Sequence, residues 1–114
     1  MSLSTHVLDT TLGKPAAGLT VLLEVALDDD LAHFRPVTTR TTDADGRIAD
    51  LVARGGLERA TYRLDFATGP YFEARGQAVF YPHVSVVFRV LDPHAHHHVP
   101  LLLSPYGYST YRGS

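Results

Sequence analysis

The sequence predicts an all-β fold: a two-sheet antiparallel sandwich of about eight short strands with one short helix. Three observations support this prediction. Apolar and polar residues alternate with a period of two along several short runs. Clusters of Gly, Pro and Asp separate these runs, as turns do between strands. Helical signals occur in one segment alone.

The first strand is expected over Leu3–Asp9, which is a short β-prone run. Alternation places His6 and Leu8 on one face of this strand and Thr5 and Val7 on the other. The Gly and Pro residues that follow end the strand.

A central strand is expected over Leu19–Leu27, because its odd-numbered positions are all apolar. The acidic segment 28–33 is interpreted as a solvated loop, and Phe34–Thr42 as the returning strand. Pro36 limits the start of that strand to a sheet edge or a bulge. The residues expected to point inward from the central strand are Leu19, Val21, Leu23, Val25 and Leu27.

A turn over Asp43–Gly46 is expected to lead into a short strand, Arg47–Leu51. The turn superficially resembles the start of a calcium-binding loop. The acidic residue that closes such a loop is missing, because Arg54 stands where it is required. Calcium binding is therefore rejected here.

In the second half, Thr61–Phe66 is expected to form a strand with Tyr62, Leu64 and Phe66 inward. Pro70–Arg75 is the one helix candidate, since Pro70 suits the first helical position. A further strand is expected over Val79–Leu91, with Pro82 delaying its regular pairing.

The final segment, His94–Ser114, carries four of the seven histidines and three tyrosines. A strand up to Leu103 would place the imidazoles of His94, His96 and His98 on one face and His97 on the other. Pro and Gly mark a turn over Ser104–Gly107. A last strand, Tyr108 to Tyr111 or Arg112, would complete a hairpin.

Length and composition limit the class of protein. A chain of 114 residues predicts a single domain, residues 1–114, that needs no disulfide staples. The absence of Cys excludes disulfides and thiolate metal sites. A net charge of -2 without a basic stripe argues against nucleic-acid binding. Without a signal-peptide pattern or a long apolar run, we expect a cytoplasmic protein that does not bind membranes.

The histidine-rich segment alone allows three interpretations. The imidazoles could lie in a solvated loop, bind zinc or copper, or act in catalysis. The sequence has neither a Cys nucleophile nor a Gly-x-Ser-x-Gly elbow, so a hydrolytic site would use direct attack by water.

Three motifs carry a resemblance to a known family. The terminal Leu-Leu-Leu-Ser-Pro-Tyr-Gly-Tyr-Ser-Thr-Tyr-Arg-Gly-Ser resembles the C-terminal signature of the 5-hydroxyisourate hydrolases, transthyretin-related enzymes of urate breakdown. Residues 4–10, Ser-Thr-His-Val-Leu-Asp-Thr, resemble the opening motif of the family, and residues 43–47, Asp-Ala-Asp-Gly-Arg, its middle motif. The motifs occur in the family's order and span almost the whole chain. At position 97 this chain has His where the family is expected to have Tyr.

The resemblance implies a transthyretin-like sandwich and hydrolysis of 5-hydroxyisourate to 2-oxo-4-hydroxy-4-carboxy-5-ureidoimidazoline without a cofactor or metal. It implies His6, Arg47 and His98 as catalytic residues, with His6, Arg47, Tyr111 and Ser114 binding the substrate. It also implies a homotetramer, a dimer of dimers, with active sites at subunit interfaces. Two alternatives stay open: a transthyretin-like carrier of a small ligand and a histidine-rich metal-binding module.

Overall fold

The structure is a computed structural model that describes residues 3–114. It contains nine strands and one short helix within these residues, two of the strands being only two residues long. The elements are β1 (Leu3–Asp9), β2 (Lys14–Pro15), β3 (Thr20–Ala26), β4 (Phe34–Thr41), β5 (Arg47–Ile48), β6 (Ala60–Phe66), α1 (Thr68–Glu73), β7 (Val84–Val90), β8 (His97–Ser104) and β9 (Gly107–Thr110).

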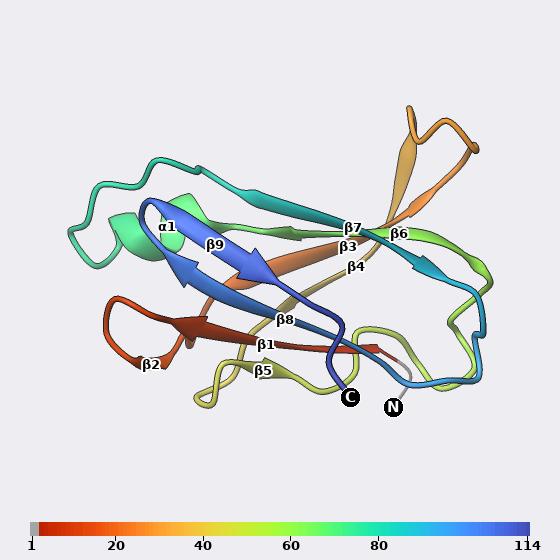
Figure 1. Ribbon diagram of the computed structural model, residues 1–114, viewed down its shortest axis with the longest axis horizontal. Coiled ribbons are helices and arrows are strands. Elements are labelled where there is room, and N and C mark those ends of the chain that lie inside the picture. The colour runs from red at the N-terminus through yellow and green to blue at the C-terminus, as the bar shows by residue number, and fades with distance from the viewer. Residues whose placement is uncertain (1–2) are drawn as a thin grey trace.

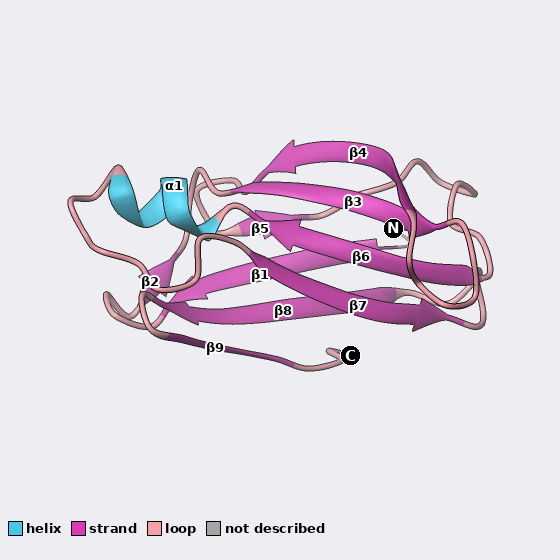
Figure 2. Ribbon diagram, turned by 90° about the horizontal axis from the view of Figure 1, so that it is seen from above, coloured by secondary structure: helices cyan, strands magenta, loops and turns pink. Residues whose placement is uncertain are grey.

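The strands form two layers, which confirms the predicted sandwich (Figures 1 and 2). One sheet has the order β2-β1-β8-β9, with β5 pairing to β1 as well, and the other has the order β4-β3-β6-β7. The strand pairs are antiparallel except for β1 and β8, which run parallel and join the two ends of the chain. The predicted C-terminal hairpin is present as β8 and β9.

The core lies between the two sheets and follows the predicted alternation. Val21 and Leu23 of β3 and Leu64 and Phe66 of β6 are fully buried. Val7 of β1 and the buried leucines of β8 face them from the other sheet. Pro36 lies where the β3–β4 register shifts, as predicted for a bulge on an edge strand.

Several details of the prediction are wrong. Leu27 does not point inward: β3 ends at Ala26, the chain turns there, and the Leu27 side chain is 61% exposed. The predicted strand Arg47–Leu51 ends after two residues, at Ile48. The helix begins at Thr68, so Pro70 occupies its third position, where a missing N–H breaks no intrahelical hydrogen bond.

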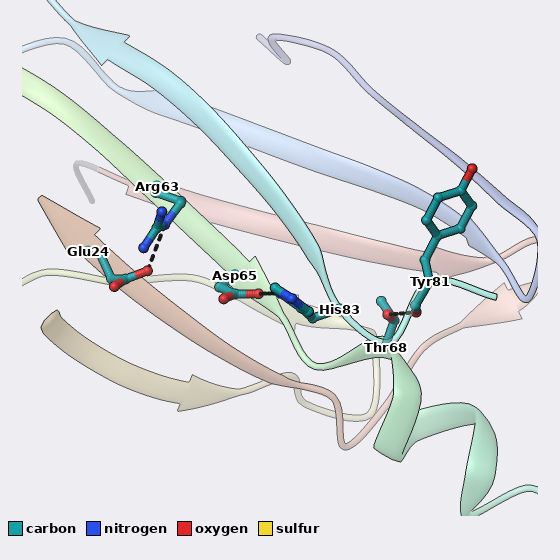
Figure 3. A network of polar contacts seen from close by, with 6 residues as sticks. All are labelled: Glu24, Arg63, Asp65, Thr68, Tyr81 and His83. Atoms are coloured by element: carbon teal, nitrogen blue, oxygen red, sulfur yellow. Dashed lines mark hydrogen bonds and ion pairs between the residues drawn. The ribbon is translucent and has the colours of Figure 1, made fainter. Parts of the chain in front are cut away.

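Polar contacts fix the second sheet and the helix that follows it (Figure 3). Arg63 donates to Glu24 across β6 and β3 at 2.8 Å, and His83 pairs with Asp65 at 2.8 Å. The Thr68 hydroxyl donates to the Tyr81 carbonyl at 2.7 Å and so ties the start of α1 to the segment before β7.

Helix α1 is also joined to the first sheet, because the Tyr71 hydroxyl donates to the buried carboxylate of Asp9 at 3.0 Å. Asp9 accepts two further bonds from main-chain N–H groups just after β1. Burial, reinforced by this carboxylate, raises the pKa of Tyr71 to about 12, so the hydroxyl keeps its proton at neutral pH. The end of β1 is thus held by a buried polar network. No helix within residues 3–114 has the length and apolar character needed to cross a membrane.

Candidate active site

Three strands bring the candidate catalytic residues to one face of the first sheet. β1 lies between β5 and β8, with His6 opposite Arg47 on one side and Ser4 opposite His98 on the other. Side chains that are in register on neighbouring strands point to the same face. His6, Arg47 and His98 therefore come together, although they lie far apart in the sequence.

The predicted turn before β5 determines where Arg47 lies. The Asp43 carboxylate accepts hydrogen bonds from the main-chain N–H groups of Asp45 and Arg47 at 2.9 and 3.0 Å. Gly46 adopts a φ of +73°, and a Cβ there would lie 2.4 Å from the Val7 carbonyl oxygen. Glycine is therefore required where the turn comes this close to β1. The Val7 N–H donates to the Gly46 carbonyl at 2.8 Å and holds the turn against the strand.

The end of the chain packs against His98. The Gly113 N–H donates to the His98 carbonyl at 2.8 Å, and a Cβ on Gly113 would lie 2.5 Å from Cδ2 of the imidazole. The chain after β9 therefore returns to β8 (Figure 1). Its backbone lies so close to the His98 ring that a side chain at position 113 would displace the ring.

The histidines of the C-terminal segment divide as their parity predicts, except for His94. The rings of His96 and His98 stack with centroids 6.4 Å apart, whereas His97 points the other way and is 5% exposed. His94 does not share their face, because it lies in the turn that precedes β8. Asp92 caps a turn there instead, accepting from the His94 N–H at 2.9 Å.

A hollow of about 290 Å³ opens over this face of the sheet. Its lining residues are Ser4, Thr5, Arg47, Ile48, Ala49, His96, His98 and Ser114. His6 stands beside it as the strand neighbour of Arg47. Tyr111 lines a separate, more apolar hollow of about 240 Å³ together with His97, and its side chain is 59% exposed. A single chain thus brings Arg47, His98 and Ser114 to one hollow and leaves Tyr111 outside it.

A larger hollow, of about 600 Å³, lies elsewhere, by the connection between β3 and β4. Asp28, Arg59 and Arg89 are among its lining residues, and none of the candidate catalytic residues reaches it. Volume alone therefore does not locate the chemistry. Within residues 3–114, no three His, Cys, Asp or Glu side chains are grouped so that they could hold one metal ion.

The surroundings of His98 favour its neutral form. Burial lowers the pKa of His98 below 6.5, and Coulombic interactions with His96, Arg47 and His6 lower it further. The hydrogen bond to the Ser4 main-chain carbonyl opposes this effect only in part. An imidazole that stays neutral near pH 7 can accept a proton from water, so this geometry suits general base catalysis.

Sequence reasoning missed Ser4, whose hydroxyl lies 2.8 Å from Nδ1 of His98, and the close packing of Gly113 on the same ring. The spacing of Ser4 and His6 by two residues was a usable signal, because it places both on one strand face. The parallel register between β1 and β8, which brings Ser4 to His98, has no local signal in the sequence.

Comparison with known proteins gives a consistent result. Residues 3–113 match the HIUase/Transthyretin family. The chain is 46% identical over 112 residues to a Salmonella dublin protein named 5-hydroxyisourate hydrolase, covering 98% of this chain and 80% of that protein. The structure of Klebsiella pneumoniae 5-hydroxyisourate hydrolase is similar with a TM-score of 0.84 at 35% identity, covering 99% of this chain and 93% of that one. Sea bream transthyretin in complex with thyroxine is similar with a TM-score of 0.90 at 29% identity, covering 99% and 95%.

The effect of Arg47 on His98 can be measured in the free protein by NMR titration of the imidazole. We expect a His98 pKa below 6.5 in the unchanged protein and a higher value in Arg47→Gln, because removing a nearby cation makes protonation easier. Arg40→Gln, the same change on the other sheet, should leave the pKa of His98 where it was. An unaltered pKa in Arg47→Gln would contradict the proximity of the two groups.

The packing of Gly113 predicts that Gly113→Ala displaces the His98 ring. A shift of about 1 Å in a catalytic group can cost up to about 100-fold in rate, so turnover should fall clearly. Gly107→Ala is the matched control, because a Cβ there meets nothing nearer than the Ser104 hydroxyl at 3.7 Å. Equal turnover in the two variants, with His98 unmoved in a crystal structure of Gly113→Ala, would refute this prediction.

Proposed function

The chain belongs to the HIUase/Transthyretin family, and from this premise we propose that it hydrolyses 5-hydroxyisourate at a site formed by His6, Arg47 and His98. The observation that carries the proposal is an imidazole whose pKa is lowered by its burial and by the nearby Arg47, and which shares one hollow with that guanidinium. These groups supply a base and a donor for developing negative charge, the two needs of an attack by water on a carbonyl.

The carrier function is the main alternative, because the same fold also occurs in a protein that holds thyroxine. Fold similarity alone does not separate the two functions. A carrier of an apolar ligand has no need for His6, Arg47 and His98 on one polar face. The acid-base character of this face, together with the hydrolases among the sequence relatives, favours the enzyme.

In the proposed mechanism, the imidazoles of His98 and His6 polarise a water molecule, which attacks the ring carbonyl carbon of the substrate. The carbonyl oxygen gains negative charge as the new C–O bond forms. The C–N bond of the six-membered ring then breaks, and the ring nitrogen takes up a proton. The product is 2-oxo-4-hydroxy-4-carboxy-5-ureidoimidazoline, and no cofactor takes part.

Arg47 is assigned to the substrate oxygens. Its planar guanidinium presents a fork of donors that matches a flat, oxygen-rich ring and stabilises the oxyanion. The same positive charge lowers the pKa of His98 and so keeps the base neutral. Ser114, at the edge of the hollow, is assigned to substrate contact.

We further propose that the chain, as a single domain, forms a homotetramer, a dimer of dimers whose sites are completed between subunits. Support comes from β9, whose outer edge has no strand partner within the described chain and can extend a partner's sheet. Tyr111, assigned to substrate binding, faces a different hollow from His98 in the single chain, so its role in this proposal depends on assembly. A cytoplasmic location stays a prediction.

Replacing either proposed imidazole should reduce turnover strongly. His98→Gln and His6→Gln are each expected to lower kcat about 100-fold or more, the usual loss when a general base is removed. The assay generates 5-hydroxyisourate from urate in place and follows its spectroscopic decay. His83→Gln is the control, because His83 lies just before β7 and pairs with Asp65 of the other sheet. Near-normal rates in both site variants would reject the assignment.

The assembly can be tested by light scattering combined with activity measurements across a dilution series. We expect particles of four chains at working concentrations and a fall in specific activity as they dissociate. A monodisperse monomer with full activity would disprove the requirement for assembly.

A further inference from the structure

The hollow of about 600 Å³, here the β3–β4 hollow, shares no lining residue with the hollow at His98. Its lining comes from the connection between β3 and β4, the start of β6 and the end of β7. Figure 1 shows this connection projecting from the body of the sandwich. Thr61 of β6 lies opposite Arg89 of β7, and the next pair, Tyr62 and Phe88, packs on the core. Thr61 and Arg89 therefore belong to the outer face of the second sheet.

Two guanidiniums line the β3–β4 hollow without a partner. Arg59, which directly precedes β6, and Arg89 are both exposed, and neither side chain forms a hydrogen bond or an ion pair within residues 3–114. Arg63, further along β6, instead donates to Glu24 at 2.8 Å. A guanidinium presents a planar fork of N–H donors that matches a carboxylate. The two free arginines thus offer a site for an anionic group.

The loop that follows β3 contributes negative charge to the same hollow, through Asp28 and Asp29. Asp28 is already engaged, because its carboxylate accepts from the Ala32 N–H at 3.0 Å and pairs with Nδ1 of His33 at 2.8 Å. The hydrogen bond with His33 lowers the pKa of Asp28 to about 2. Asp29 has no side-chain partner in the described part of the chain. Neither acid pairs with the two arginines, so charges of opposite sign border one space without meeting.

Exposed leucines complete the lining. Leu27, Leu31 and Leu91 are 61%, 40% and 58% exposed, and all three border the hollow. Leu31 has a φ of +59° and is the one residue other than glycine with a positive φ among residues 3–114. A leucine in this conformation is strained, and its exposed side chain gains little from burial in return. An apolar ligand lying against these side chains supplies that burial.

We propose that the β3–β4 hollow binds a small zwitterion that carries a carboxylate and an ammonium group at opposite ends of an apolar chain. The carboxylate contacts Arg59 and Arg89, the ammonium group contacts Asp29, and the methylene groups lie against the leucines. A ligand with only one of the two charges binds less well, because it leaves the other set of protein charges unpaired. The inference is independent of the proposed hydrolysis, whose residues do not line this hollow.

The test uses ε-aminocaproate as the probe, because a short methylene chain separates its two charges. A titration followed by NMR should show saturable shifts of the methyl groups of Leu27, Leu31 and Leu91. Caproate, which lacks the ammonium group, and hexylamine, which lacks the carboxylate, should each bind about fivefold more weakly, as expected for the loss of one exposed ion pair. Added salt should weaken the binding of ε-aminocaproate, because it screens exposed charges.

Two variants remove one protein charge each. Arg59→Gln and Asp29→Asn replace exposed side chains, so the fold should be retained, and each should weaken ε-aminocaproate binding about fivefold. Arg59→Gln should reduce the preference for ε-aminocaproate over hexylamine, and Asp29→Asn the preference over caproate. Arg54→Gln and Asp30→Asn are the matched controls, because neither residue lines the hollow, and both should bind like the unchanged protein.

Equal affinities for caproate and ε-aminocaproate, shifts that do not saturate, or site variants that bind like their controls would each overturn the zwitterion site. Hydrolysis of 5-hydroxyisourate should be the same in Arg59→Gln, Asp29→Asn and the unchanged protein. An unchanged protein that binds ε-aminocaproate as expected but fails to open 5-hydroxyisourate would refute the proposed function and support this site.

Discussion

The parallel pairing of β1 with β8 is the constraint on which the site depends. This pairing places Ser4 opposite His98, and the same strand carries His6 opposite Arg47 on its other edge. The inner face of β1 meanwhile contributes Val7 to the core. Because a one-residue slip would turn every side chain of the strand to the other face, core burial and the geometry of the candidate site are fixed by the same register. The buried Asp9 network holds the end of the strand in place.

Much of the fold could be predicted from local patterns. Alternation identified the inward faces of β3 and β6, and the Pro-Gly turn identified the hairpin of β8 and β9. The errors arose where short-range geometry overrode alternation: Leu27 follows the end of its strand, and Asp92 caps a turn that removes His94 from β8. The start of the helix was predicted two residues too late, because proline is tolerated throughout the first helical turn and not only at its first residue.

The candidate site was harder to predict from the residues alone than the fold was. Parity placed His96 with His98 and His97 opposite, but no local pattern reveals that the first strand lies beside the eighth. The association of His6, Arg47 and His98 therefore came from resemblance and not from spacing. Ser4 and Gly113 went unnoticed because their importance comes from distance to one ring, which depends on tertiary packing. The chemistry thus depends on side chains that a shared fold does not specify.

The central claim is that an uncharged imidazole and a guanidinium act on one substrate in this hollow. A crystal structure of the assembled protein with urate, a planar analogue of the substrate, tests it most directly. The account predicts ring oxygens within about 3 Å of the Arg47 guanidinium and a ring edge facing Nε2 of His98. Urate bound only elsewhere, for example in the hollow by Arg59 and Arg89, with the His98 face empty, would contradict it.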